Sequence, residues 1–406
     1  MRIVQKFGGT SVGSLERIGK TADLVAAELA QGNQVAVVVS AMSGETNRLT
    51  SMAHEICAQP AARELDALVA TGEQVSAALL AIELQNRGIA AYSYSGGQAG
   101  FVTDSKHERA RIKDIEGDHL LTRLQAGEVP VVTGFQGVDE QGNVTTLGRG
   151  GSDTSAVALA IAVEADVCDI YTDVDGIYTT DPRIVPKARK IERIAYEEML
   201  EFASLGAKVL QTRSVELAMR YNMPLHLRSS FEPVAGTMVV QEDDSMERAT
   251  ISGVAYNRDE AKITIMGIPD QPGIAANVFG PVAGAGINVD VIVQNVSEQG
   301  YTDITFTVPT GDYQQTMDIM RRLCKQMDAR DVKGDDSVAK VSVVGVGMRS
   351  HSGVAKDMFD ILAREGVNIQ MITTSEIKIT VVIDEKYIEL AVRTLHSAFG
   401  LDAEDS

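Results

Sequence analysis

The chain has few cysteines, no excess of positive charge and no long apolar run. Cys57, Cys168 and Cys324 stand at unrelated spacings that match no metal-binding pattern, so we expect reduced thiols. The formal net charge of −19 argues against nucleic acid or an anionic membrane surface as a partner. No apolar run reaches the length of a membrane span, and residues 1–4 enter a strand-like segment directly, so a cytoplasmic protein without a signal peptide is expected.

The rest of the composition is that of a soluble globular protein. Apolar residues make up 44% and charged residues 23% of the 406 positions. A chain of this length exceeds what one ordinary hydrophobic core holds. We therefore expect two or three domains.

The first half of the chain alternates β-rich and helical runs. Residues 35–39, 129–133 and 167–171 are short apolar runs typical of buried strands. Residues 14–31, opened by a serine N-cap and followed by a glycine, carry apolar side chains at helical spacing. Alternating strands and helices predict an α/β domain over residues 1–240, with a mainly parallel sheet sandwiched by helices.

The last third contains an internal repeat, which follows a polar and mostly acidic run at 241–250 that we interpret as a solvated linker. Residues 273–289 match residues 353–369 at a constant offset of 80, with glycines, a Phe and an Asn in register. Each copy has the pattern strand, helix, strand, strand, helix, and Asn288 and Asn368 begin the second predicted strands. The repeat predicts two copies of a small α+β module rather than a solenoid.

The most informative segment is TLGRGGSDTSA, residues 146–156. Its glycines allow a ligand to approach the backbone, Arg149 offers a planar fork to a carboxylate or phosphate, and a helix N-terminus follows. An ordinary glycine-rich turn with Ser152 or Asp153 as the helix N-cap is the other interpretation. The segment alone leaves both open.

Other polar loops follow predicted strands. Residues 6–9, Lys-Phe-Gly-Gly, lie between the first strand and the first helix, where open α/β sheets bind ligands, and they suit a phosphate group. The lysine precedes the glycines, so this is no Walker A loop, and a structural turn remains the alternative. Residues 40–46 form a second such loop. Glu73 stands at the start of a helix, where an acid also occurs for helix stability alone.

Residues 171–183, YTDVDGIYTTDPR, form a third polar segment. The Asp-x-Asp-Gly start suggests an EF-hand, but Ile184 occupies the twelfth position, where such a loop needs a glutamate. A strand that ends in Asp and is followed by a turn with Pro and Arg better suits a loop that lines a nucleotide. Its carboxylates could hold Mg²⁺ against phosphates, although the pattern does not say which ones.

Taken together, these segments resemble those of aspartate kinases. KFGGTSVGS, TGEQVSAALL, GFQGV, TLGRGGSDTSA and YTDVDGIYTTDPR occur here in the order found in that family. The repeated module resembles a pair of ACT domains, the small effector-binding fold of amino-acid metabolism. The resemblance covers essentially the whole chain. It implies an amino-acid-kinase fold followed by one ACT domain at 262–335 and a second built from 251–261 and 336–406.

The resemblance also implies a reaction: transfer of the γ-phosphoryl group of ATP, with Mg²⁺, to the β-carboxylate of L-aspartate. This step begins lysine, threonine, methionine and diaminopimelate synthesis. Lys6 and Lys208 would stabilise the transferring phosphoryl group, and Asp153 would orient Lys6 or the metal. Arg149 would hold the α-carboxylate of aspartate and Glu73 its α-ammonium.

The family's remaining site residues carry over in the same way. They comprise a substrate pocket of Thr46, Gly150, Gly151 and Ser152, and a nucleotide site of Lys6, Phe7, Gly8, Gly9, Ser40, Thr172, Asp173, Tyr178, Thr179, Thr180, Asp181, Pro182, Arg183 and Lys208.

For the ACT pair, the resemblance implies feedback inhibition by lysine and threonine and a homo-oligomer formed through these domains. Some relatives also have a small ACT-only subunit made from an internal start, for which Met246 is suitably placed. The candidate effector contacts are Asp270, Gly273, Ile274, Ala275, Ile287, Asn288, Val289 and Gln294 in the first copy, and Val354, Ala355, Asn368, Ile369, Ser375 and Glu376 in the second. Ile287, Val289 and Ile369 are equally good core residues.

Two other functions are consistent with parts of this pattern. A different amino-acid kinase, such as a glutamate or acetylglutamate kinase, is disfavoured by the Arg149 loop, the Glu73 segment and the ACT pair together. An amino-acid sensor without catalysis is disfavoured by the presence of Lys6, Lys208, Arg149 and Asp153.

Overall fold

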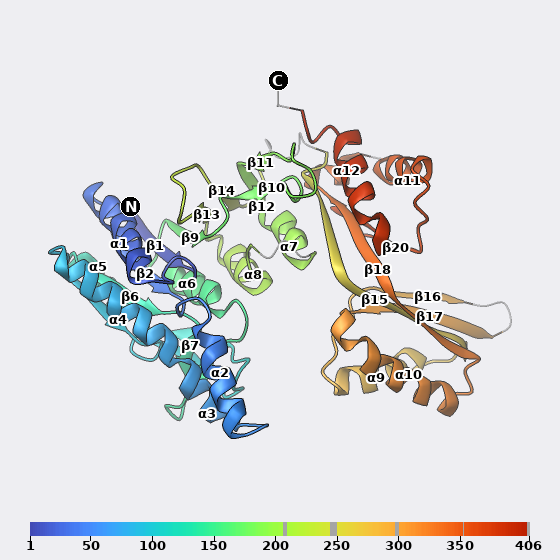
Figure 1. Cartoon of the computed structure of the whole chain (residues 1–406), viewed down its shortest axis with the longest axis horizontal. Helices are drawn as coiled ribbons and strands as arrows, with labels where there is room; N and C mark the ends of the chain where they lie inside the picture. The colour runs from blue at the N-terminus through green and yellow to red at the C-terminus, as the bar shows by residue number, and fades with distance from the viewer. Residues whose placement is uncertain (206–208, 244–249, 297–299, 352, 404–406) are drawn as a thin grey trace. The chain divides into compact units, whose positions relative to one another are not determined.

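The computed structural model of the chain describes residues 1–205, 209–243, 250–296, 300–351 and 353–403. These residues form two compact units (Figure 1). The first comprises Met1–Tyr178 and Lys190–Glu247, and the second comprises Thr179–Arg189 and Arg248–Ser406. The segment Thr179–Arg189, which the sequence placed in the first domain, therefore packs with the second unit.

An eight-stranded sheet forms the centre of the first unit, in the order β12-β14-β13-β9-β1-β2-β6-β3. Neighbours from β13 to β3 pair in parallel, which confirms the α/β class, and only the β13–β14 pair is antiparallel. The strands are β1 (Arg2–Phe7), β2 (Gln34–Val39), β3 (Ala91–Tyr94), β6 (Val129–Thr133), β9 (Val167–Thr172), β12 (Arg193–Ala195), β13 (Leu225–Ser229) and β14 (Thr237–Val240).

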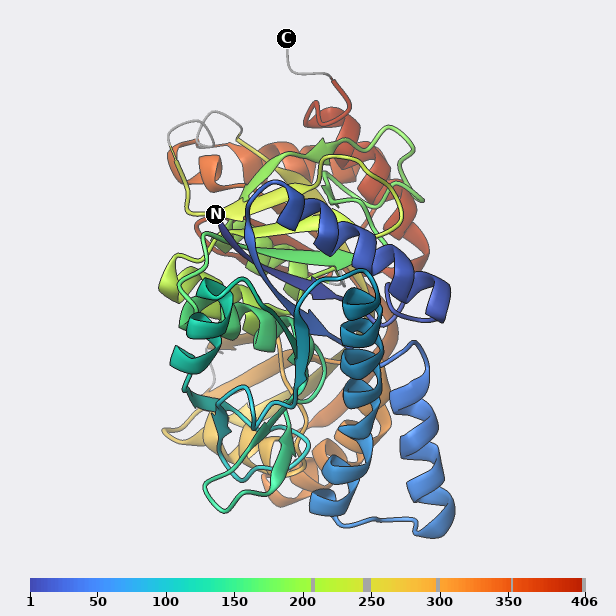
Figure 2. The same ribbon diagram turned by 90° about the vertical axis from the view of Figure 1, so that its left-hand side faces the viewer.

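Helices cover this sheet because its central strands are apolar on both faces. Figure 2 shows α1 (Leu15–Ala30) and α4 (Thr71–Asn86) side by side, where both pack on the odd-numbered valines of β2. Ser14 caps α1 as expected, accepting a hydrogen bond from the Arg17 N–H. The other face carries α6 (Gly151–Ala162), which contacts β1, β2 and β9. Helices α5 (Asp118–Gln125), α7 (Tyr196–Ser204) and α8 (Thr212–Tyr221) also belong to this unit.

A smaller four-stranded sheet, in the order β5-β4-β7-β8, lies beside α3 (Ala62–Val69), which packs on β8. Helix α2 (Glu45–Ile56) packs on α3 in turn. The strands are β4 (Phe101–Thr103), β5 (Ile112–Ile115), β7 (Gln136–Val138) and β8 (Val144–Thr146), and a separate hairpin pairs β10 (Ile177–Tyr178) with β11 (Lys190–Ile191).

Helices α3 and α4 together span Ala62–Asn86, 25 residues that are long and apolar enough by composition to cross a membrane. The expectation that no apolar run reaches this length was therefore wrong. More than half of the apolar stretch is buried inside the protein. It also buries Asp66 and Glu73, whose carboxylates accept hydrogen bonds from the Thr146 N–H and the Ala41 N–H, which is the behaviour of a core helix.

The second unit is a six-stranded antiparallel sheet in the order β16-β17-β15-β18-β20-β19. Its helices pack in pairs, α9 with α10 and α11 with α12. The elements are β15 (Gly253–Pro269), α9 (Ile274–Gly284), β16 (Ile292–Val296), β17 (Tyr301–Val308), α10 (Tyr313–Gln326), β18 (Asp331–Val344), α11 (Val354–Arg364), β19 (Met371–Thr374), β20 (Lys378–Asp384) and α12 (Ile388–Ala398), with single 3₁₀ turns at Thr310–Asp312, Val346–Ser350 and Glu385–Tyr387.

The two ACT copies share their central strands. The first half of β15, from Gly253, pairs with the end of β18, while its second half pairs with β17 and with the start of β18. Residues 253–261, which the resemblance assigns to the second ACT domain, are thus continuous with the first strand of copy one. Asn288 and Asn368 precede β16 and β19, which begin at Ile292 and Met371, so the prediction that these asparagines open strands was wrong.

Candidate active site

Three loops meet at the carboxyl ends of β1, β2 and β9. The Gly8 N–H donates to the Tyr171 carbonyl at 3.1 Å, and the Ser40 N–H donates to the Phe7 carbonyl at 3.0 Å. The Ser43 N–H then donates to the Gly9 carbonyl at 3.1 Å. Parallel strands end at one edge of the sheet, so polar loops that are distant in sequence become neighbours here.

Lys6 and Asp153 form a buried ion pair at this edge. The Lys6 Nζ lies 2.7 Å from Asp153 Oδ1, and each side chain is only 10% exposed. Lys6 is near the end of β1, whereas Asp153 lies in the first turn of α6. The pair therefore brings the Lys-Phe-Gly-Gly loop to the start of the helix that Arg149 precedes.

Arg149 lies in the loop that leads into α6. Its side chain is exposed and has no hydrogen-bond or ion-pair partner among the residues that the structure describes. Gly150 caps the helix with φ = +71°, a left-handed conformation that glycine adopts without strain. The Gly151 carbonyl accepts a hydrogen bond from Ser155 Oγ at 3.0 Å, so the turn after Arg149 is fixed from inside the helix. Ser152 lies beside Gly134, whose missing side chain leaves room for it.

Glu73 is a buried acid with one unused oxygen. Its Oε1 accepts a hydrogen bond from the Ala41 N–H at 3.0 Å, in the loop after β2, and the residue is 3% exposed. Its Oε2 is buried and has no hydrogen-bond partner within the described part of the chain. Burial raises the pKa of the Glu73 carboxyl to about 7, and the hydrogen bond from Ala41 offsets part of that rise. A buried carboxylate oxygen without a donor is the kind of group that a ligand ammonium satisfies.

The remaining predicted substrate and nucleotide residues of the first unit lie close to these loops in the sequence. Thr46 is half-buried on α2, and Thr172 donates to Asp173 Oδ1 at 3.1 Å after β9. The Tyr178 hydroxyl donates to Asp175 at 3.0 Å. Lys208 lies outside the described residues. No cluster of three or more His, Cys, Asp or Glu side chains suited to a metal ion occurs in the described ranges.

Residues 179–183, predicted to line the nucleotide, belong to the second unit. Asp181 pairs with Arg183 at 2.7 Å and accepts a hydrogen bond from the Tyr256 hydroxyl at 2.8 Å. The Arg183 guanidinium lowers the pKa of the Asp181 carboxyl to about 2. Thr179 Oγ1 lies 2.8 Å from His396 Nε2, while Thr180 is buried and Pro182 is exposed. The structure therefore gives these residues partners in the second ACT copy.

The predicted effector residues of the first copy divide into two groups. Asp270, Gly273, Ile274, Ala275 and Gln294 line one surface hollow of about 500 Å³ at the start of α9, together with Gln271 and Pro272. Ile287 is instead a core residue at 6% exposure, Val289 packs against the same core, and Asn288 is exposed.

The second copy repeats part of this arrangement. Val354 lies in its core, and Ala355 and Ile369 pack against that core, whereas Asn368, Ser375 and Glu376 are exposed. Glu376 lies 3.7 Å from Arg349.

The structure also shows polar residues that the sequence did not single out. Asp66 is fully buried and accepts hydrogen bonds from Thr146 and Glu108, and Arg213 Nη1 donates to the Leu147 carbonyl at 2.7 Å. Asp66 and Arg213 each lie within an amphipathic helix that carries other charged residues. No spacing pattern marks either residue, so only the folded geometry identifies them.

Comparison with known families agrees with this architecture. Residues 1–229 match the amino acid kinase family, and residues 262–325 and 341–399 each match an ACT domain. The fold and the site therefore define an amino acid kinase followed by two ACT domains.

Comparison with individual proteins shows which amino acid kinases this chain resembles. The aspartokinase of Pseudomonas aeruginosa is 58% identical over 99% of this chain and 98% of its own length. The crystal structure of E. coli aspartokinase III in complex with aspartate and ADP (R-state) superposes with a TM-score of 0.82 at 29% identity, covering 98% of this chain and 99% of that one. The same enzyme in complex with lysine and aspartate (T-state) gives 0.80 at 30% identity over the same shares. The chain belongs to the aspartokinases and is an aspartate kinase.

Proposed function

We propose that the chain transfers the γ-phosphoryl group of ATP to the β-carboxylate of L-aspartate, giving 4-phospho-L-aspartate and ADP. This reaction would open lysine, threonine, methionine and diaminopimelate synthesis. The observation that carries the proposal is the site at the sheet edge. There the buried Lys6–Asp153 ion pair joins β1 to the start of α6, after the exposed Arg149, and the buried Glu73 of α4 keeps one oxygen without a hydrogen-bond partner among the described residues. The E. coli relative bound to aspartate and ADP supports it.

In this proposal the two ends of aspartate are held by opposite charges. Arg149 holds the α-carboxylate through its planar fork, and the free oxygen of Glu73 accepts the α-ammonium. Thr46, Ser152 and the backbone of Gly150 and Gly151 complete the pocket. This arrangement leaves the β-carboxylate as the only unpaired group of the substrate.

The β-carboxylate is already a nucleophile at neutral pH, so the reaction needs no general base. The main obstacle is bringing a carboxylate close to the γ-phosphate, because both are anions. Lys6 would neutralise charge on the transferring phosphoryl group together with Lys208, and Asp153 would hold Lys6 in place. Mg²⁺ would enter with ATP, bound mainly by phosphate oxygens, and would screen the same charge.

The nucleotide would be lined by the loops after β1, β2 and β9. These loops contribute Phe7, Gly8, Gly9, Ser40, Thr172, Asp173 and Tyr178, and we assign residues 179–183 to the same role from the family's pattern.

We further propose that the ACT pair regulates the kinase through lysine and threonine. The hollow at Asp270–Ala275 and Gln294 supports an amino-acid site, because it combines an acid, a helix N-terminus and an amide. The E. coli enzyme bound to lysine supports the choice of effector. We also propose a cytoplasmic homo-oligomer, a kinase domain over 1–240, and ACT domains at 262–335 and at 251–261 with 336–406. A separate small subunit starting at Met246 would begin outside the described residues.

The direct test is an assay for an acyl phosphate product. Purified enzyme with Mg-ATP and L-aspartate in hydroxylamine should give aspartyl hydroxamate, and L-glutamate in place of aspartate should give none. Lysine and threonine are then added singly and together. Absence of hydroxamate would refute the reaction, and unchanged activity in all three effector conditions would refute the regulation.

A further inference from the structure

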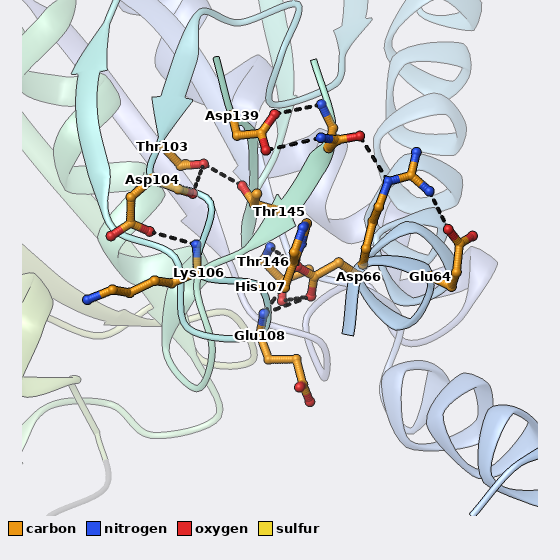
Figure 3. Close-up of polar contacts among 12 residues, drawn as sticks. Glu64, Asp66, Thr103, Asp104, Lys106, His107, Glu108, Asp139, Thr145 and Thr146 are labelled. Carbon is orange, nitrogen blue, oxygen red and sulfur yellow. Dashed lines mark hydrogen bonds and ion pairs between the residues drawn. The ribbon is translucent and has the colours of Figure 1, made fainter. Parts of the chain in front are cut away.

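Asp66 is a buried carboxylate whose polar partners come from two segments of the first unit, residues 107–108 and residue 146 (Figure 3). It lies in α3 and is fully buried. Its oxygens accept the Thr146 hydroxyl at 2.5 Å, the Thr146 N–H at 3.1 Å, the Glu108 N–H at 3.1 Å, and His107 Nδ1 lies 2.8 Å away. A carboxylate with this many donors is a strong and directional anchor.

One of these partners leads directly to the proposed substrate arginine. Thr146 is the last residue of β8, and Arg149 follows three positions later. Beyond Asp66, the backbone here is fixed on both sides: the Ala110 N–H donates to the Thr146 carbonyl at 2.8 Å, and the Leu147 N–H donates to the Phe135 carbonyl at 2.8 Å. Asp66 thus holds the last strand residue from which the Arg149 loop departs.

The other partners support the same loop from the opposite side. Glu108 adopts φ = +64°, a left-handed conformation that is strained for a residue other than glycine, and Asp66 holds its N–H in that position. The Glu108 carbonyl oxygen lies only 2.9 Å from where a side chain on Gly148 would begin. The segment that Asp66 fixes therefore forms a wall against which Gly148, the residue before Arg149, is packed.

Arg149 depends on this backbone because its side chain has no partner of its own among the described residues. We propose that Asp66 is a positioning residue for aspartate binding: it fixes Thr146 and the 107–110 segment, and these place the Arg149 loop for the α-carboxylate. The inference rests on the proposed role of Arg149. It assigns Asp66 an effect on aspartate affinity that acts through Arg149 and leaves ATP binding unchanged.

The same small sheet contains a matched control. Asp139, 4% exposed, accepts the Gln141 N–H at 3.0 Å and the Asn143 N–H at 2.8 Å in the turn between β7 and β8. It is therefore also a buried carboxylate that orders backbone, but it lies at the opposite end of β8 from Thr146 (Figure 3). Replacing it tests the general effect of losing such an acid.

The experiment is steady-state kinetics of the full chain with Asp66→Ala, Thr146→Val, Asp139→Ala, Arg149→Ala and the Asp66→Ala/Arg149→Ala double variant. Asp66→Ala should raise the aspartate KM by roughly tenfold, and Thr146→Val, which removes one hydroxyl donor, should raise it by a smaller factor. The ATP KM should stay unchanged in both. Asp139→Ala should lower thermal stability and leave the aspartate KM unchanged. The double variant should match Arg149→Ala alone, since both changes act on one group.

An unchanged aspartate KM in Asp66→Ala and Thr146→Val, while Arg149→Ala raises it, would overturn this inference alone. The inference would also be overturned if Asp66→Ala raised the aspartate KM by the same factor in the Arg149→Ala background as in the wild type, because Asp66 would then act independently of Arg149. A normal aspartate KM in Arg149→Ala would refute the proposed role of Arg149 and this inference with it. If Asp66→Ala does not fold, Thr146→Val decides, and a wild-type aspartate KM there contradicts the inference.

Discussion

At the scale of single residues, the site consists of buried charged side chains, and the stability of each charge depends on the groups that contact it. Lys6 is satisfied by Asp153 at 2.7 Å, whereas Glu73 keeps one oxygen without a partner in the described chain. Lys6 is thus a cation held in a fixed position, and Glu73 offers a buried acceptor oxygen to a ligand. Removing water from such groups strengthens the interactions they make with a bound ligand.

The raised pKa of Glu73 predicts a pH dependence of aspartate binding. The carboxyl, with a pKa of about 7, is neutral below that pH and charged above it. Only the charged form attracts an α-ammonium, so the aspartate KM should fall as the pH rises through about 7, and below it should climb by up to about tenfold per pH unit. Kinetics in overlapping buffers on both sides of about pH 7 measure this.

Glu73→Gln provides the control, because glutamine keeps the shape without a titratable proton. Its aspartate KM should be high and nearly independent of pH across the same range. A wild-type KM that is flat through this range, or a Glu73→Gln variant that keeps the wild-type slope, would show that Glu73 does not bind the α-ammonium.

At the scale of elements, the start of α6 decides where Arg149 and Asp153 lie. Gly150 caps this helix at φ = +71°, and a Cβ there would lie 1.8 Å from Gln211 Cγ. Gly150→Ala should therefore cost about 1–2 kcal/mol of stability from backbone strain alone, and it should also raise the aspartate KM. Thermal unfolding and steady-state kinetics on one preparation measure both effects.

Gly142 is the matched glycine for this test. Its φ is +80°, and nothing lies within 4 Å of the position where a side chain would begin. Gly142→Ala should carry the same backbone strain and leave the aspartate KM at the wild-type value. Equal KM values for the two variants would contradict the role given to the α6 terminus.

Strands and helices could be predicted from the sequence where the local apolar pattern matches the burial of the element in the fold. The apolar runs at 35–39 and 129–133 became β2 and β6, because buried parallel strands need apolar residues on both faces. Lys6 and Glu73 were identified by motif. In the structure the loop after β2 connects their segments, because Ser43 bonds to Gly9 and Ala41 bonds to Glu73. Asp66 was missed because it is one of several charged residues in an amphipathic helix, and its partners come from residues 107–108 and 146, far away in the sequence.

Hydrophobic periodicity could not predict that the two ACT copies share strands, for a related reason. Which strand pairs with which is a long-range choice, and a 17-residue strand such as β15 can serve two modules at once. The packing of Thr179–Arg189 with the second unit has the same cause, because Ile184 and Val185 find their core among residues of the second copy.

At the scale of the whole molecule, the second unit is one structure built from two repeats. Lys340 of copy two forms ion pairs with Glu260, at 2.6 Å, and with Asp290 of copy one. Lys262 of copy one hydrogen-bonds Gln370 of copy two, at the repeat position that matches Asp290. The two lysines lie on β15 and β18, the strands that both copies share, and their partners Asp290 and Gln370 lie just before β16 and β19.

This sharing predicts that the two ACT copies unfold together. Ile263→Ala, in the core of copy one, should cost about 2–5 kcal/mol, and should lower hydrogen-exchange protection in copy-two peptides as well. Val381→Ala, in the core of copy two, should do the reverse. Mass spectrometry of hydrogen exchange resolves the two copies by peptide.

Peptides of the first unit serve as the internal reference for that measurement. Loss of protection confined to the copy that carries the substitution would contradict a single cooperative unit.

The most direct test compares the contribution of Arg149 to aspartate binding with the contribution of Lys6 to the rate of phosphoryl transfer. Measured with aspartate and Mg-ATP varied separately, Arg149→Ala should raise the aspartate KM and leave the ATP KM unchanged, whereas Lys6→Ala should lower kcat far more than it changes either KM. An Arg149→Ala enzyme with a wild-type aspartate KM would contradict the account.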